Sequence, residues 1–268
     1  MSSTFAFFAS RRFLPLFSTQ FLGAFNDNLL KTAFLVWVSY AGLSFAGLPA
    51  AQIVNLASGL FILPFFLFSA TAGRLAEKID KARVARWVKL SELAIMLLAA
   101  LGFSQHHAGV LLLALFLMGA HSTFFGPVKY AMLPQHLRPH ELIGGNGLIE
   151  MGTFIAILLG QMAGGMLALH SLPLTIALLM LAAALGWASS RTIPPAPPSA
   201  PDLPLHLNLW RDTADLLCQA RRTPALWTAM LGISWFWLLG AVYLTQLPTF
   251  TRLHLGGDPQ VYTLILAV

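Results

Sequence analysis

The chain has 268 residues, of which 57% are hydrophobic and only 10% are charged, and its formal net charge is +6. Ordinary soluble domains carry about 25% charged residues, so this composition excludes a typical soluble domain and indicates a protein with several membrane-spanning helices. The basic residues lie in short segments between apolar runs, as the positive-inside rule requires, and therefore do not indicate a nucleic-acid partner.

Seven apolar runs have roughly the length of about 20 residues that a helix needs to cross a bilayer. In chain order they are residues 13–40, 53–75, 87–103, 109–132, 144–169, 172–189 and 225–250. An eighth run begins near Gln260 and reaches only Val268, which is too short to span a membrane. We therefore expect an all-α membrane bundle that is truncated in its eighth helix.

The connections between these runs alternate in charge. Arg11 and Arg12 precede the first run, and the connections after the second, fourth and sixth runs contain Lys or Arg. The other connections, at residues 41–52, 104–108 and 170–171, contain neither. Because Lys and Arg are retained on the cytoplasmic side, this alternation predicts a cytoplasmic N-terminus.

The connection between the sixth and seventh runs differs from the others. Residues 194–201 are rich in proline, which predicts a stiff, extended segment. The stretch after it is amphipathic, with Trp210, Ala214 and Leu217 on one face of a helix that would lie along the inner membrane surface. Such a stretch fits either a linker with a loosely docked helix or a regulatory element.

These features predict three parts: a six-helix half over residues 1–191, a cytoplasmic linker over 192–224, and the start of a second half over 225–268. Two parallel halves of six helices, a 6+6 plan, are a recurring design of secondary transporters.

The most informative residues lie in the middle of the first run, where Asn26, Asp27 and Asn28 are followed by Lys31. An ionised carboxylate in hydrocarbon costs about 2.5–3.5 kcal/mol on insertion scales, so Asp27 is expected to face a polar cavity between helices. Lys31 follows Asp27 by four residues and shares its helix face, so the two could instead form a structural ion pair.

Glu150 lies about two turns into the fifth run, and Asn146 precedes it on the same face. These two side chains fit either a transport path or a bridge between helices. Small residues recur every fourth position along the same run, which predicts a seam for close helix packing. They are Gly152, Ala156, Gly160, Gly164 and Ala168.

Other polar residues within the runs are expected to be structural. Lys89 and Glu92 stand three residues apart and predict an ion pair near the inner membrane interface, and His121 is expected to be a hydrogen-bonded histidine of the bundle. His136 and His140 have the spacing of metal ligands, but Pro139 separates them and no third ligand is near. We therefore expect no metal, no cofactor and no catalytic residue, and the sequence lacks the phosphate-binding glycine motif of ATP-driven pumps.

The connection at residues 73–83 resembles the cytoplasmic loop signature of the major facilitator superfamily. The positions that match are Gly73, Leu75, Ala76, Lys78 and Lys81, whereas Glu77 replaces the usual Asp and Asp80 the usual Gly. The resemblance implies a gating loop made of Gly73, Glu77, Lys78, Lys81 and Arg83. It also implies the fold of that superfamily.

Within the superfamily, the chain resembles the lysophospholipid transporter family. The resemblance rests on residues 25–28, 126–134, 145–150 and 156–160. It implies movement of lysophospholipids, chiefly lysophosphatidylethanolamine, to the inner face of the bacterial inner membrane. Some members continue into acyltransferase and ligase domains, so such a domain downstream, or a separate acyltransferase, is an expected partner.

The hypothesis for the site follows from these residues. Asp27 would bind the ammonium of a zwitterionic head group, Asn26 and Asn28 its glycerol or phosphate, and Lys31 or Lys129 its phosphate. Glu150 and Asn146 would shape the cytoplasmic half of the path. The alternatives are a carrier of a small solute or drug, a membrane-embedded enzyme using Asp27 and Glu150, and a helical scaffold without transport.

Overall fold

The computed structural model describes residues 10–204, 209–256 and 265. All regular structure in these residues is helical, which confirms the all-α prediction. The helices are α1 (Leu14–Tyr40), α2 (Ala50–Lys78), α3 (Lys81–Ser104), α4 (Ala108–His136), the short η2 (Pro139–Glu141), α5 (Leu142–Leu167), α6 (Leu172–Ser190), α7 (Leu209–Arg221) and α8 (Pro224–Leu253). The predicted eighth run from Gln260 lies almost wholly outside the described residues.

Five of these helices are long and apolar enough to span a membrane by length and composition, namely α2, α3, α4, α5 with η2, and α6. Helix α1 has 27 residues, but Asn26, Asp27, Asn28 and Lys31 at its centre lower its hydropathy. Its length suits a membrane span, and its composition suits an interior position.

Proline and aspartate mark several helix starts. Pro15, Pro173 and Pro224 lie in the first turns of α1, α6 and α8, where the missing N–H costs no helical hydrogen bond. Asp80 caps α3 by accepting a 2.8 Å hydrogen bond from the Arg83 backbone N–H. These signals place the helix ends close to where the apolar runs predicted them.

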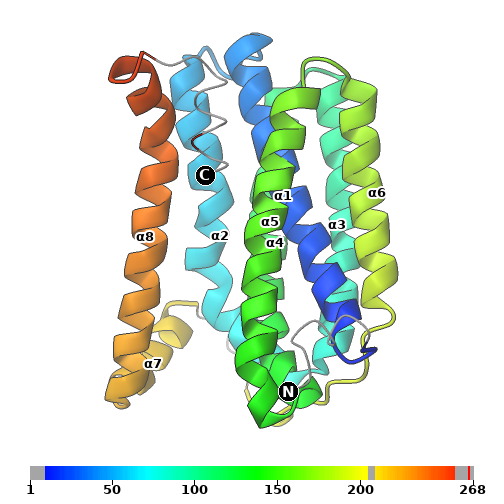
Figure 1. Ribbon diagram of the computed structural model, residues 1–268, viewed down its shortest axis with the longest axis vertical. Helices are drawn as coiled ribbons and strands as arrows, with labels where there is room; N and C mark the ends of the chain where they lie inside the picture. Colours follow the sequence, from blue (N-terminus) through cyan, green and yellow to red (C-terminus); the bar gives the residue numbers. More distant parts are fainter. Residues whose placement is uncertain (1–9, 205–208, 257–264, 266–268) are drawn as a thin grey trace. The chain divides into compact units, whose positions relative to one another are not determined.

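The chain divides into two compact units, residues 1–209 and 210–268, and each is described by itself. The predicted boundaries at residues 191 and 224 remain predictions. In the first unit, successive helices run in opposite directions (Figure 1). Helix α1 packs mainly against α5 and α6, α4 packs against α2 and α3, and α3 also packs against α6. We call the end where α1 begins the basic end, because Arg11, Arg12 and the α2–α3 connection lie there.

The second unit contains α7 and α8. The Arg221 guanidinium lies over the Trp227 ring, 4.9 Å from its centroid, at the turn between them. Large apolar side chains such as Trp235 and Phe236 are exposed along α8. Such a surface is typical of a helix that needs lipid or other helices around it.

Helix α5 lies close against α1 along the predicted small-residue seam. A Cβ at Gly160 would overlap the Phe25 carbonyl and stand 3.1 Å from Asn28 Cβ. A Cβ at Gly164 would stand 2.9 Å from the Leu29 carbonyl oxygen. These contacts confirm the seam, and they hold α5 beside the segment of α1 that contains Asp27.

We expect Gly160→Ala to lower the free energy of unfolding by about 1–3 kcal/mol, because the new methyl group would meet backbone atoms that cannot move aside locally. Gly165→Ala on the same helix is the matched control, because a Cβ there meets nothing within 4 Å. Unfolding in detergent, followed by loss of helical circular dichroism, measures both. Equal stability of the two variants would show that α1 and α5 are not closely packed.

Candidate functional site

The first unit has two apolar cores with a polar layer between them. One core joins Leu29–Val38 of α1 to buried residues of α3 and α4 away from the basic end. The other joins Phe13 and Leu16 to buried residues of α3, α4 and α5 near the basic end. Between the cores lie six polar side chains: Asn26, Asp27, Lys89, Glu92, His121 and Ser122. We call these six residues the central polar layer.

The central polar layer lies at mid-depth in the bundle. Asp27 is at the midpoint of α1 (Leu14–Tyr40), and Ser122 is at the midpoint of α4 (Ala108–His136). Glu92 is at the middle of α3 (Lys81–Ser104). In a bundle that spans a bilayer, this is the depth at which transporters place their substrate sites.

Asp27 has one carboxylate oxygen bound and one oxygen without a partner. Ser122 Oγ donates a 2.6 Å hydrogen bond to Asp27 Oδ2. Asp27 Oδ1 is buried and has no hydrogen-bond partner among the described residues. A buried acceptor without a donor is costly, so this oxygen is suited to a donor that arrives with a ligand.

Glu92 connects three helices through its two oxygens. Asn26 Nδ2 of α1 donates to Oε1 at 2.8 Å, and Lys89 Nζ of α3 donates to Oε2 at 2.7 Å. His121 Nε2 of α4 lies 3.3 Å from Oε2. The predicted Lys89–Glu92 pair is confirmed, but its expected place near the inner interface is wrong: both side chains are fully buried at the middle of the bundle.

The Lys89 side chain lies against glycines of two neighbouring helices. A Cβ at Gly23 of α1 would overlap Lys89 Nζ, and one at Gly186 of α6 would lie 3.8 Å from Lys89 Cδ. The ammonium also lies over the Phe125 ring, 5.0 Å from its centroid. The Lys89–Glu92 ion pair is therefore enclosed by four helices, and its two opposite charges cancel within the layer.

Lys31 and Asn28 lie beside the layer without joining it. Lys31 Nζ lies over the Phe61 ring of α2, 5.4 Å from its centroid, and does not form an ion pair with Asp27. Asn28 Nδ2 donates to the Ala24 carbonyl of its own helix at 2.8 Å. Asp27 therefore has no cationic side chain within ion-pair distance among the described residues.

A second polar cluster lies nearer the basic end, between α1, α4 and α5. Gln20 accepts hydrogen bonds from Lys129 Nζ at 3.4 Å and from Thr153 Oγ1 at 3.1 Å. The Tyr130 hydroxyl donates to Glu150 Oε1 and links α4 to α5. Asn146 is exposed and lies one turn before Glu150. Lys129 and Glu150 thus come together in one region, which is separate from Asp27.

The predicted gating loop is covered by the proline-rich segment that follows α6, residues 193–204. Ser199 N and Ala200 N donate to the Glu77 carbonyl at 2.9 and 3.0 Å, and Ala196 N donates to Asp80 Oδ2 at 3.1 Å. Because prolines lack an N–H, such a segment offers mainly carbonyl oxygens to its neighbours.

Basic and amide side chains bind those carbonyl oxygens. Lys81 Nζ donates to the Pro197 carbonyl and to Ser199 Oγ, both at 3.0 Å. Arg86 Nη2 donates to the Ile193 carbonyl at 3.2 Å. Gly73, Lys78 and Arg83 also lie at this end of the bundle: a Cβ at Gly73 would meet nothing within 4 Å, and the Arg83 backbone N–H is used by the α3 cap.

We expect Lys81→Met to release this segment, because it removes two hydrogen bonds donated by a buried ammonium. The backbone amides of Ser199 and Ala200 should then exchange with deuterium about tenfold faster. Lys78→Met is the matched control, because it makes the same change at a lysine that forms no hydrogen bond or ion pair with the described residues of the segment. Unchanged protection in Lys81→Met would mean that Lys81 does not hold the segment in place.

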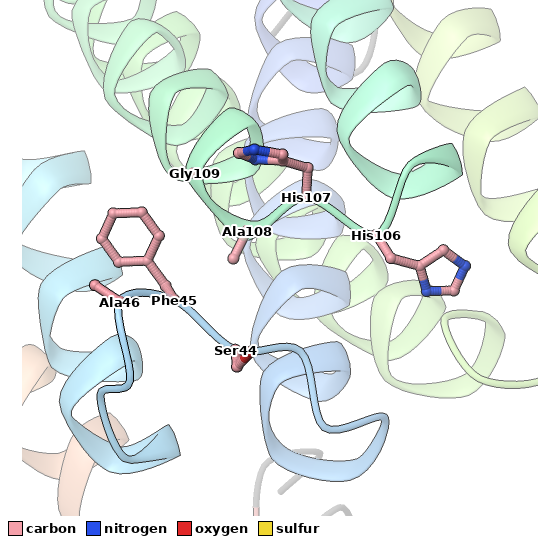
Figure 2. Close-up of a pocket in the computed structure, with 7 residues that line it drawn as sticks. All are labelled: Ser44, Phe45, Ala46, His106, His107, Ala108 and Gly109. Carbon is pink, nitrogen blue, oxygen red and sulfur yellow. The ribbon is translucent and has the colours of Figure 1, made fainter.

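A surface pocket of about 250 Å³ lies at the end of the unit opposite the basic end, between the α1–α2 and α3–α4 connections. Figure 2 shows the imidazole of His106 pointing away from Phe45. The His106 ring packs on Trp37, with 4.8 Å between the ring centroids. The His107 ring caps α4 by accepting a hydrogen bond from Val110 N. The polar groups of this pocket do not converge on a common point, so it is a weaker candidate than the central polar layer.

Sequence reasoning missed several members of these clusters. Ser122, Gln20, Thr153 and Tyr130 carry no local signal, because hydroxyl and amide side chains within apolar helices are common. A comparison of depth along each helix would have found Ser122, since it lies at the same mid-helix level as Asp27 and Glu92. Within the described ranges, three or more His, Cys, Asp or Glu residues do not group as a metal site.

A sequence model described as Major Facilitator Superfamily matches residues 4–268. The chain is 27% identical over 266 residues to the lysophospholipid transporter of Serratia proteamaculans, covering 97% of this chain and 63% of that protein. It is 27% identical to the protein of the same name from Pectobacterium carotovorum, over 86% of this chain and 54% of that protein. It is 32% identical to the lysophospholipid transporter of Salmonella arizonae, over 59% of this chain and 37% of that protein. The chain thus spans less than two thirds of the length of these relatives.

Proposed function

The chain belongs to the Major Facilitator Superfamily and is a multi-pass membrane protein, and on this premise we propose that it is a secondary transporter of lysophospholipids in the bacterial inner membrane. A lysophosphatidylethanolamine-like lipid is the proposed substrate. The three relatives are lysophospholipid transporters by name, which supports this substrate class, and each match covers part of the relative. The protein would move the lipid without changing it chemically.

The state of Asp27 is the observation that carries the proposal. Asp27 lies at mid-depth and has one oxygen held by Ser122 and one without a partner. The nearby Lys89–Glu92 pair carries no net charge, and the Asp27 carboxylate has no cationic side chain within ion-pair distance among the described residues. A cationic group such as the ammonium of an ethanolamine head group would complete this site.

Lys31 suits the other end of the same head group. It lies one helical turn from Asp27, a rise of about 5.4–6 Å, and its ammonium stands free of Asp27 over the Phe61 ring. An ethanolamine phosphate carries its positive and negative charges at the two ends of a short spacer, so an acid and a base one turn apart on the same helix suit its two ends. Asn28 lies on the same stretch of α1 and would border the head group. The Asn26 amide is already bonded to Glu92, so Asn26 would line the site without binding the lipid through that amide group.

The second polar cluster is proposed as the next part of the path. Lys129 would meet the lipid phosphate, and Glu150 with Asn146 would border the path toward the basic end. We place this end, with the N-terminus, in the cytoplasm, because the Lys and Arg residues of the connections gather there. The loop at Gly73–Arg83 would act there as the gating loop, with residues 193–204 across it.

An acyltransferase that consumes the delivered lipid remains a proposed partner, as a separate protein or a domain farther along the gene. The matched relatives are transporters by name, and they supply no support for a fused enzyme.

Transport into sealed vesicles tests the proposal. Vesicles containing the full-length protein should take up lysophosphatidylethanolamine faster than empty vesicles, and mass spectrometry should recover the lipid unchanged. Uptake of a water-soluble solute without any response to lysolipid would instead indicate a small-solute carrier. Chemical conversion of the lipid by the purified protein would indicate an enzyme.

A further inference from the structure

In the central polar layer, two neighbouring residues of α1 and two of α4 each turn to different partners. Asn26 points to Glu92 of α3, whereas Asp27 points to Ser122 of α4. On α4, His121 lies against Glu92, while Ser122 reaches Asp27. Helices α1 and α4 are therefore joined twice at the same depth, once through Glu92 and once directly.

The Ser122 hydroxyl behaves differently from most hydroxyls in this bundle. Ser58, Ser104, Thr123 and Thr175 each donate to the backbone carbonyl four residues earlier in their own helices. That local bond is the usual way for a helical Ser or Thr to satisfy its hydroxyl in apolar surroundings. Ser122 instead donates across the helix interface to Asp27, at 2.6 Å.

This single bond decides what Asp27 can offer to a ligand. The terminal torsion of an Asp side chain is broad, so a free carboxylate would turn between several orientations. With Oδ2 held by Ser122, that torsion is fixed and Oδ1 remains as the acceptor for another donor. Ser122 is in turn placed by α4, on which the neighbouring His121 Nε2 lies 3.3 Å from the fully buried Glu92.

We propose that Ser122, with His121 and Glu92 behind it, is the positioning residue for the head-group site: it holds the Asp27 carboxylate so that one oxygen meets the cationic group of the lipid. The proposal rests on the proposed function. Ser122 acts through Asp27, so its loss should weaken substrate binding and leave the later steps of transport in place.

Ser122→Ala is expected to raise the KM for lysophosphatidylethanolamine about tenfold, the equivalent of one hydrogen bond to a charged group, with a maximal rate within about twofold of the parent. Ser122→Thr keeps the hydroxyl and should restore the KM. Ser58→Ala is the matched control, because it removes a hydroxyl that serves only its own helix. Transport by the full-length protein in vesicles measures all three, and thermal unfolding in detergent reports their stability.

The outcomes separate this proposal from the proposed function. An unchanged KM in Ser122→Ala, with transport lost in Asp27→Asn, would overturn the positioning role and leave the function standing. A KM that Ser122→Thr does not restore, together with lowered stability, would also overturn it, because the serine would then serve only packing. Unchanged transport in both Ser122→Ala and Asp27→Asn would overturn the positioning role together with the role of Asp27, whereas no lysophosphatidylethanolamine uptake by the parent itself would overturn the proposed function.

Discussion

Removing either charge of the Lys89–Glu92 pair is expected to lower the free energy of unfolding by about 3–5 kcal/mol. Both side chains are fully buried, and their charged atoms are 2.7 Å apart. Lys89→Met would leave a carboxylate enclosed by apolar cores, and Glu92→Gln would leave an ammonium in the same place. An uncompensated charge at that depth is far more costly than a lost hydrogen bond.

The double variant Lys89→Met/Glu92→Gln should recover most of that loss. It removes both charges together, keeps a carbonyl oxygen for Asn26, and fills similar volumes, and buried pairs replaced in this way are often neutral in stability. We expect it to unfold within about 1 kcal/mol of the parent. Lys78→Met controls for the lysine change itself. Unfolding in detergent, followed by loss of helical circular dichroism, measures the series, and single variants as stable as the double would contradict an enclosed ion pair.

Asp27→Asn is expected to reduce lysophosphatidylethanolamine transport at least about tenfold to a hundredfold, because a charge-assisted contact worth about 1.5–3 kcal/mol is lost. The amide fits the same space, and it removes a charge that has no cationic side chain within ion-pair distance in the described part of the chain. Stability should therefore stay equal or rise slightly. Retained stability in Asp27→Asn would distinguish it from Glu92→Gln, for which a large loss of stability is expected.

Two controls define the Asp27 measurement. Asp202→Asn removes an exposed carboxylate from the segment after α6 and should transport like the parent. Asp27→Glu keeps the charge but moves it by one methylene, so it should retain more transport than Asp27→Asn. Equal transport by the parent and Asp27→Asn, at equal protein levels, would remove Asp27 from the path.

The helices and the importance of Asp27 could be predicted because both depend on sequence patterns within a single segment. An apolar run of sufficient length has few alternatives to a membrane helix, and an acid in its middle needs a polar neighbour. The Lys89–Glu92 pair was equally readable, since its members are three residues apart on one helix. Each of these predictions depends on residues within one element.

The partners of these residues could not be predicted, because they come from other helices. Asn26 and Glu92 are 66 positions apart, and Asp27 and Ser122 are 95 positions apart. No pattern within one helix indicates that the Ser122 hydroxyl bonds Asp27 instead of the backbone carbonyl four residues earlier in its own helix. The two apolar cores fix how the helices stack, and that stacking determines which polar side chains share a level.

The proline-rich segment shows the same limit. Its composition predicted an extended conformation, and residues 193–204 are free of helix, as expected. Its docking on the α2–α3 connection depends on Lys81, Arg86 and Asp80, which lie more than 100 positions earlier. The signature loop and the segment that covers it are therefore one structural unit at the basic end.

The central claim is that the Asp27 carboxylate meets the positive charge of the lipid head group inside the bundle. The most direct measurement compares transport of lysophosphatidylethanolamine with that of its N-acetylated analogue, which lacks the ammonium charge, by the parent and by Asp27→Asn. The account predicts that the parent prefers the charged lipid by about tenfold or more and that Asp27→Asn transports the two lipids at similar, low rates. The same preference in both proteins would contradict it.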